Sequence, residues 1–154
     1  MLKKNLRNIY KEKRNHLSYN QKEKLDDLML IQFQKLPIDI PSMIMTYAPF
    51  EKHNEFDPQL ITDYCYFKNS NQVLFYPLMD EQNKSLMSVV VNDDTVFEKN
   101  QFGIDEPVNG MDMFPEEIDL VFVPLLCADK KGNRVGYGKR LLRQVFKRVQ
   151  ERYH

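Results

Sequence analysis

A strongly apolar stretch of this 154-residue chain runs directly into its most glycine-rich one. Residues 119–127, DLVFVPLLC, are followed by residues 129–139, DKKGNRVGYGK, which hold three of the five glycines. A buried strand that leads into such a loop is suited to holding a phosphate, because glycine lets backbone N–H groups approach an anion. Arg134 and Lys139 would supply the countercharge. The segment therefore predicts a nucleotide-phosphate site, and a tight turn without a ligand is the alternative.

The rest of the chain alternates helical and strand patterns. Helices are predicted at residues 2–16, 19–36 and 58–66 and from residue 137 onwards, and strands at residues 42–47, 73–76, 86–91 and 120–123, with a turn-rich loop at residues 102–107. The apolar side of the first helix is marked by Leu2, Leu6, Ile9, Tyr10 and Leu17. Ser18 is a candidate N-cap for the second helix. The alternation predicts one α/β domain over residues 1–154, with a three-layer architecture and a mainly parallel central sheet flanked by helices. In such sheets, ligands gather at the carboxyl ends of the strands.

Composition and charge favour a cytoplasmic globular protein. The formal net charge is zero, so there is no general case for a nucleic-acid or membrane partner, and no segment is long and apolar enough to span a membrane. Cys65 and Cys127 have no metal-ligand spacing, which indicates buried reduced thiols. The three histidines lack spaced partners, so they are expected on the surface rather than at a metal.

Charged residues stand out in the first helix and after the first strand. Four basic residues recur at helical spacing and so form a stripe, for which a solvated face is the default interpretation: Lys4, Arg7, Lys11 and Arg14. The loop after the first strand carries Glu55 and Asp57. These carboxylates could bind a substrate, could simply solubilise the loop, or could cap the next helix, and the cap is favoured for Asp57. Asp129 either fixes the glycine-rich turn or assists Mg²⁺, and the turn is favoured.

Taken in order, these segments resemble the 5-formyltetrahydrofolate cyclo-ligase family, also called methenyltetrahydrofolate synthetases. Residues 119–139 carry the main similarity. Further matches are KKNLR at residues 3–7 with Arg14, Tyr47 through EFDP at residues 55–58, FYP at residues 75–77 and FGIDEP at residues 102–107. The resemblance covers residues 3–139. It implies an ATP-driven reaction in which the formyl oxygen of 5-formyltetrahydrofolate is phosphorylated, N10 attacks the activated carbon, and loss of phosphate yields 5,10-methenyltetrahydrofolate.

The resemblance also implies roles for particular residues. The residues expected to bind ATP are Lys3, Lys4, Arg7, Arg134, Val135, Gly136, Tyr137, Gly138 and Lys139, with Arg134 and Lys139 also acting in catalysis. The residues expected to bind the folate substrate are Tyr47, Glu55, Asp57 and Tyr76. Phosphoryl transfer depends on positioning and charge neutralisation more than on a covalent nucleophile, which suits this set. ATP and Mg²⁺ are the expected cofactors, although the family's aspartate near Mg²⁺ is absent after Lys139.

The family motif breaks immediately after Lys139. The family continues with Gly-Phe/Tyr-Tyr-Asp-Arg, whereas this chain reads RLLRQVFK at residues 140–147 and has six basic residues against one acidic residue over 139–154. Codons for residues 139–147 exist in which deletion of one adenine restores Lys-Gly-Phe-Tyr-Asp-Arg-Phe-Leu. The hypothesis is that residues 140–154 are an atypical tail produced by a frameshift, with the family's last strands missing. DNA sequencing across codon 139 tests it.

The broken motif leaves alternatives to a working cyclo-ligase. A truncated chain would leave a sheet edge unpaired, so impaired activity and self-association are expected in place of the family's monomer. The principal alternative function is a catalytically inactive, truncated module that binds nucleotide or folate. An enzyme acting on phosphosugars or transferring CoA on a similar sheet is disfavoured, because neither a suitable glutamate motif nor a lysine base is evident.

Overall fold

The computed structural model describes residues 2–80, 85–108, 110–113 and 115–136. Three α-helices and two short 3-10 helices lie within these ranges: α1 (Lys3–Asn15), α2 (Tyr19–Gln34), η1 (Glu51–His53), α3 (Gln59–Lys68) and η2 (Pro115–Glu117). The strands are β1 (Met43–Met45), β2 (Val73–Asp80), β3 (Ser85–Val91), β4 (Phe97–Lys99), β5 (Asp105–Pro107), β6 (Asp112–Met113), β7 (Leu120–Val121), β8 (Cys127–Ala128) and β9 (Arg134–Val135).

Five strands form a central sheet in the order β6-β3-β2-β1-β7. Strand β1 is parallel to both β2 and β7, whereas β3 is antiparallel to both β2 and β6. Because β6 thus points the same way as β2, only β3 runs against the other four strands. Two separate hairpins, β4–β5 and β8–β9, accompany the sheet. The predicted α/β class with a mainly parallel sheet is confirmed.

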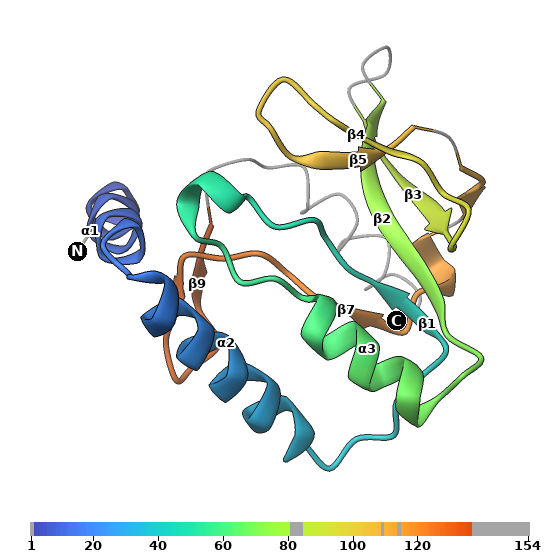
Figure 1. Cartoon of the computed structure of the whole chain (residues 1–154), viewed down its shortest axis with the longest axis horizontal. Helices are drawn as coiled ribbons and strands as arrows, with labels where there is room; N and C mark the ends of the chain where they lie inside the picture. The colour runs from blue at the N-terminus through green and yellow to red at the C-terminus, as the bar shows by residue number, and fades with distance from the viewer. Residues whose placement is uncertain (1, 81–84, 109, 114, 137–154) are drawn as a thin grey trace.

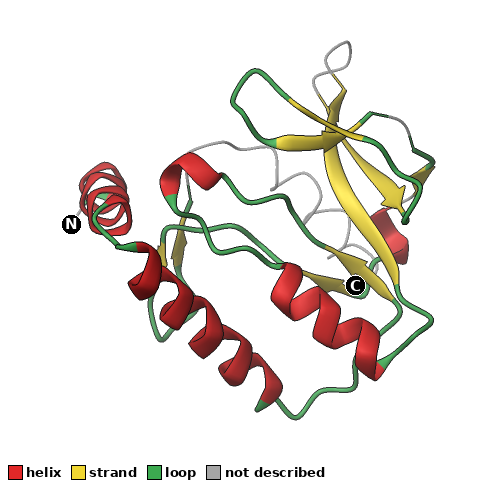
Figure 2. Cartoon of the chain, viewed as in Figure 1, coloured by secondary structure: helices red, strands yellow, loops and turns green. Residues whose placement is uncertain are grey.

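Helices α2 and α3 pack on one face of the sheet (Figures 1 and 2). On this face Ile44 of β1 meets Ile61 and Cys65 of α3, and Leu30 and Phe33 of α2 pack against the cluster. The next residue of β1 points to the opposite face, where it joins a second cluster: Met45, Phe75 and Ile118. Successive side chains of a strand alternate between faces, so neighbouring residues of β1 contribute to the hydrophobic clusters on both faces of the sheet.

Helix α2 begins where the sequence predicts. Ser18 Oγ accepts a hydrogen bond from Gln21 N at 3.2 Å, and Ser18 N donates to Gln21 Oε1 at 2.9 Å, which completes a reciprocal capping box. These two bonds satisfy backbone donors that the first turn of a helix leaves without partners.

Ser18→Ala is therefore expected to lower the free energy of unfolding by about 1 kcal/mol. Denaturant unfolding followed by circular dichroism measures the change. Ser70→Ala, at an exposed turn position, serves as the control and should stay within about 0.5 kcal/mol of the parent chain. Equal effects of the two substitutions would contradict the capping role.

Several element boundaries differ from those predicted. Strand β2 does not end at Pro77 but continues to Asp80, since Pro77 pairs with Ser88 of β3 and β1 pairs only as far as Phe75. A proline is tolerated there because its nitrogen can face the side without a neighbouring strand. Strand β7 stops at Val121, and the predicted turn at residues 102–107 ends in strand β5. Residues 137–154, where a helix is predicted, lie outside the described residues.

The described helices and the two cysteines bear on two further predictions, namely the lack of a membrane span and the buried reduced thiols. Within the described ranges, no helix is long and apolar enough to cross a membrane. Both cysteines are free; Cys65, on the inward side of α3, is fully buried, whereas Cys127 is only partly buried. Burial raises the pKa of the Cys65 thiol to about 11, so this side chain is an unreactive part of the core.

Candidate active site

Helix α1 and the glycine-rich segment meet although they stand at opposite ends of the described chain. Arg7 Nε donates a hydrogen bond to the carbonyl of Gly136 at 2.9 Å across 129 residues of sequence. The contact is partly buried, and Figure 1 shows α1 beside β9. Within the described residues, a Cβ placed on Gly136 would meet no atom within 4 Å. Positive charge and open backbone thus lie together, as a phosphate requires. We call Arg7, Arg134 and Gly136 the basic cluster.

The glycine-rich segment is a hairpin in which Asp129 organises the turn. Its Oδ1 accepts from Lys131 N at 2.8 Å and from Asn133 N at 2.9 Å, and its Oδ2 accepts from Asn133 Nδ2 at 2.8 Å. Gly132 adopts φ +84°, in the left-handed region that favours glycine. Gly132 therefore shapes the turn between β8 and β9, and the favoured role of Asp129 in fixing that turn is confirmed by these bonds.

The hydrogen bonds from Asn133 lower the pKa of the Asp129 carboxyl below its ordinary value of 3.8. A carboxyl with a lowered folded-state pKa adds stability above its unfolded-state pKa, and loses it as the pH falls through the folded-state value. NMR titration should find this low pKa, and Asn133→Ala should raise it toward 3.8. Asn20→Ala, at an exposed position of α2, should leave it unchanged. An Asp129 pKa that does not respond to Asn133→Ala would contradict the account.

The other residues predicted to bind ATP are placed as follows. Lys3 and Lys4 are exposed on the first turn of α1, one turn before Arg7, and Arg134 is exposed on β9. The side chain of Val135 is buried, and its carbonyl accepts from Leu126 N at 2.8 Å. Val135 thus supports the hairpin from inside. Tyr137, Gly138 and Lys139 lie outside the described residues.

The basic stripe of α1 is not a simple solvated face. Arg14 Nη2 donates to the carbonyls of Leu125 at 2.9 Å and Leu126 at 3.4 Å, so both arginines of the stripe bind the segment that contains the hairpin. Two residues on the predicted apolar side, Leu2 and Ile9, are exposed instead. Helix α1 is therefore held by polar contacts of its basic side, which an apolar–polar pattern alone does not predict.

The loop after β1 buries a carboxylate. Glu55 is only 5% exposed, and its Oε1 accepts a hydrogen bond from Phe50 N at 3.1 Å. Tyr47 is also buried, and its hydroxyl donates to the carbonyl of Phe56 at 3.1 Å. These bonds close the loop onto itself at the carboxyl end of β1. The alternative that Glu55 merely solubilises the loop does not fit its burial.

Asp57 and Tyr76 lie together beside this loop. Asp57 Oδ1 accepts from Gln59 N, the first residue of α3, at 2.9 Å, and so caps the start of the helix from one residue before Pro58, which holds the N-cap position and makes no side-chain cap bond. Tyr76 packs edge-to-face on Phe97 of β4, with ring centroids 5.3 Å apart. Burial raises the pKa of the Tyr76 phenol, and the nearby carboxylates of Asp57 and Asp105 raise it further. We call Tyr47, Glu55, Asp57 and Tyr76 the acidic cluster.

Three contributors to this region were not predicted from the sequence. Phe97 comes from the β4–β5 hairpin, and its aromatic side chain carries no signal for this position. Lys52 of η1 reaches the turn between β4 and β5, since a Cβ placed on Gly103 in that turn would lie 3.6 Å from Lys52 Cε. Asn54, directly before Glu55, adopts φ 51°, in the left-handed region. Asparagine tolerates this region better than most residues, so an asparagine in a polar loop is a sequence signal for a turn at this position.

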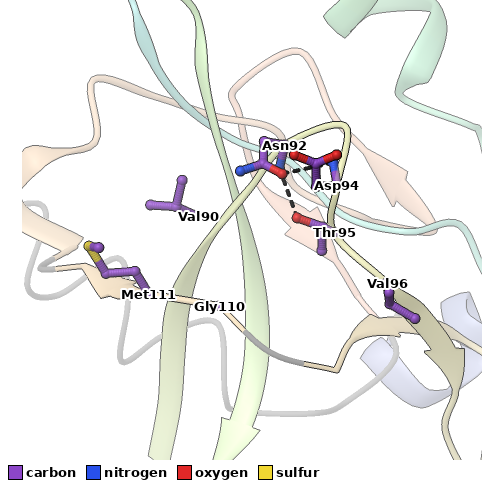
Figure 3. A pocket seen from close by; sticks show the side chains of 7 residues that line it. All are labelled: Val90, Asn92, Asp94, Thr95, Val96, Gly110 and Met111. Atoms are coloured by element: carbon purple, nitrogen blue, oxygen red, sulfur yellow. Dashed lines mark hydrogen bonds between the residues drawn. The ribbon is translucent and has the colours of Figure 1, made fainter.

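A hollow elsewhere on the molecule does not belong to this site. It has a volume of about 420 Å³ and lies at the β3–β4 turn, lined by Val90, Asn92, Asp94, Thr95, Val96, Gly110 and Met111 (Figure 3). None of the predicted site residues lines it. Among the described residues, no three His, Cys, Asp or Glu side chains gather in a way that could hold a metal ion.

Comparison with known proteins decides the family. The model of the 5-formyltetrahydrofolate cyclo-ligase family matches residues 1–153. The chain belongs to this family. The matched range includes residues 140–153, where the sequence departs from the family motif. This match does not test the frameshift hypothesis, which stays a prediction.

Individual cyclo-ligase relatives agree with the family match. The 5-formyltetrahydrofolate cyclo-ligase of Haemophilus influenzae is 34% identical over 98 residues, which are 62% of this chain and 50% of the relative. The chain thus spans about half the length of the curated relative it matches. The structure of Aquifex aeolicus 5,10-methenyltetrahydrofolate synthetase is similar with a TM-score of 0.77 and 26% identity, covering 97% of this chain and 74% of that one.

A second solved cyclo-ligase structure supports the fold. The 5,10-methenyltetrahydrofolate synthetase of Mycoplasma pneumoniae aligns with a TM-score of 0.70 and 20% identity, covering 96% of this chain and 78% of that one. The α/β architecture described above is therefore that of the cyclo-ligase family.

Proposed function

We propose that this chain converts 5-formyltetrahydrofolate to 5,10-methenyltetrahydrofolate, with hydrolysis of ATP to ADP and phosphate. The observation that carries the proposal is the hydrogen bond from Arg7 Nε to the carbonyl of Gly136 in a chain of the cyclo-ligase family. This bond brings the cationic helix to the glycine-rich hairpin. The names of the Haemophilus and Aquifex relatives supply the reaction.

In this proposal the basic cluster holds the nucleotide phosphates. Arg7 is fixed by its bond to Gly136, so its remaining guanidinium nitrogens are oriented without further ordering when an anion arrives. Arg134 adds positive charge from β9, and no atom of the described residues lies within 4 Å of a Cβ placed on Gly136, which leaves room there for a phosphate oxygen to approach the backbone. Lys3, Lys4 and the residues that follow Gly136, through Lys139, complete the proposed nucleotide site and its catalytic cations.

The acidic cluster would bind the folate. A buried carboxylate such as Glu55 favours ligand N–H donors, which the polar edge of a pterin supplies. The ring of Tyr47 and the Tyr76–Phe97 pair offer flat apolar surface to the pterin ring. Because Asp57 caps α3, its part is to orient the loop that contains Glu55.

Mg²⁺ is proposed as a companion of the nucleotide. Magnesium sites of this kind use one or two carboxylates together with substrate phosphates and water, so a preformed cluster of protein ligands is not required. We further propose a cytoplasmic monomer, with self-association if the family's last strands are missing.

The proposal is tested by following ADP release from the purified chain with ATP, Mg²⁺ and 5-formyltetrahydrofolate. ADP is expected to form only when the folate is present, in a one-to-one ratio with the methenyl product. ADP formation that is independent of the folate would contradict the assignment.

A second candidate is an inactive module that binds nucleotide or folate. Its support is that the chain departs from the family motif after Lys139. Calorimetry with each ligand separates the two candidates, since binding of both ligands without any turnover would favour the module. Sequencing of the gene across codon 139 shows whether the departure is encoded.

A further inference from the structure

The carboxyl-terminal end of α1 is bonded to the loop of the acidic cluster. Asn54 Nδ2 donates a hydrogen bond to the carbonyl of Arg14 at 3.1 Å. The Arg14 carbonyl also accepts a hydrogen bond from Leu17 N at 3.2 Å, so Asn54 adds a second bond, from outside the helix, to the last turn of α1. Arg14 itself reaches the carbonyls of Leu125 and Leu126 with its guanidinium group. Arg14 therefore joins the loop of residues 50–55 to the segment that leads into the hairpin.

Asn54 also sets the conformation of the residue that follows it. It is the one non-glycine residue with positive φ in the described part of the chain, at 51°. Its backbone N–H donates to Glu51 O at 3.0 Å, and the next N–H, of Glu55, donates to Phe50 O at 3.4 Å. The left-handed turn at Asn54 thus reverses the chain and returns the Glu55 carboxylate to Phe50 N. Asn54 is a positioning residue for Glu55.

Helix α1 also reaches the basic cluster, two turns before the end that Asn54 binds. Arg7 and Arg14 are seven residues apart, two helical turns, and so lie on the same side of α1 about 10 Å from each other. One end of this segment holds Gly136, and the other holds Asn54. None of the thirteen residues of α1 is buried, so these polar contacts contribute much of what places the helix. A ligand that orders one end then lowers the cost of ordering the other.

We propose that α1 couples the basic cluster to the acidic cluster through the Asn54–Arg14 hydrogen bond, so that nucleotide and folate bind with positive cooperativity. The coupling rests on the proposed function, because it requires both ligands to use these clusters. Linkage is reciprocal: the factor by which one ligand tightens the other is the same in both directions.

The decisive variant is Asn54→Gly, because glycine keeps the left-handed conformation and loses only the amide. Calorimetry with a non-hydrolysable ATP analogue, with and without saturating 5-formyltetrahydrofolate, measures the coupling. In the parent chain the folate should tighten analogue binding about fivefold or more. In Asn54→Gly this ratio should fall to about one, with the Kd of each ligand alone changed less than threefold (roughly the loss expected for one neutral hydrogen bond).

The matched control is Asn69→Gly. Asn69, the C-cap residue of α3, also donates its Nδ2 to a backbone carbonyl, that of Ile40 at 3.0 Å; it further donates to Ser42 Oγ at 3.3 Å and accepts from Asn71 N at 3.1 Å. Asn69→Gly should destabilise the fold at least as much as Asn54→Gly and keep the fivefold coupling. Coupling that survives in Asn54→Gly, or a parent chain that binds both ligands independently, would overturn the proposal.

A measurement without ligands separates this proposal from the proposed function. Hydrogen exchange of the amides of His53, Asn54 and Glu55 should accelerate about tenfold in both Arg7→Ala and Asn54→Gly, because each variant releases one end of α1. If the chain binds neither ligand and the exchange still accelerates, the proposed function fails while the mechanical link stands. If exchange in Arg7→Ala equals that of the parent chain, the link through α1 is refuted whatever the chain binds.

Discussion

Arg7→Ala is expected to lower kcat/KM for ATP about 10- to 100-fold, since hydrogen bonds of a charged donor contribute about 1.5–3 kcal/mol. Its guanidinium lies partly buried at the glycine-rich hairpin, 2.9 Å from Gly136 O, where it is oriented before any anion binds. Steady-state kinetics with ATP as the varied substrate measure the loss. Most of it should fall on KM, because the proposed role of Arg7 is to hold phosphates in both ground and transition states.

Two further variants sharpen this test. Arg7→Lys keeps the charge but loses the planar fork of donors, so it should recover only part of the activity. Lys24→Ala removes a cation from an exposed position of α2 and should leave kcat/KM unchanged. An Arg7→Ala protein that unfolds at the same denaturant concentration as the parent chain and retains its KM for ATP would contradict the assignment of the basic cluster.

Glu55→Gln is expected to raise the KM for 5-formyltetrahydrofolate at least about tenfold, because a charge-assisted hydrogen bond is replaced by a neutral one. Glutamine matches glutamate in size, and its carbonyl oxygen can still accept from Phe50 N, so the loop itself should be retained. The KM for ATP should change less than about twofold, because the substitution removes an interaction with the folate and none with ATP.

The control for this prediction comes from the same loop. Glu51 lies four residues earlier in η1 and is exposed, whereas Glu55 is 5% exposed. Glu51→Gln removes the same charge from the loop and should leave both KM values within experimental error. Identical effects of Glu51→Gln and Glu55→Gln would mean that only the net charge of the loop matters, against a specific role for Glu55.

The local parts of the fold were predictable from short sequence patterns. Ser18 followed by Gln21 indicates a capping box, and Asp57 with Pro58 indicates the start of α3; the structure has both. Asp129 and Gly132 likewise specify their turn within five residues. In these cases the interacting groups are close in sequence, so their chemistry determines the backbone without help from the rest of the chain.

The long-range contacts were not predictable in the same way. The 129-residue separation of Arg7 and Gly136 is bridged only by the folded sheet, and the family resemblance rather than any spacing suggested their common role. Helix α1 was expected to turn its apolar side inward, yet the hydrogen bonds of Arg7 and Arg14 orient it by its basic side. The Tyr76–Phe97 pair also depends on a hairpin whose two strands have no strong pattern of their own.

The central claim is that this chain closes the folate ring at the expense of ATP. The most direct measurement is the absorbance of 5,10-methenyltetrahydrofolate after the purified full chain is mixed with 5-formyltetrahydrofolate, ATP and Mg²⁺. The account predicts an increase that requires ATP and is strongly reduced by Arg7→Ala. A folded chain that binds both ligands and produces no methenyl absorbance above the reaction without protein would contradict it.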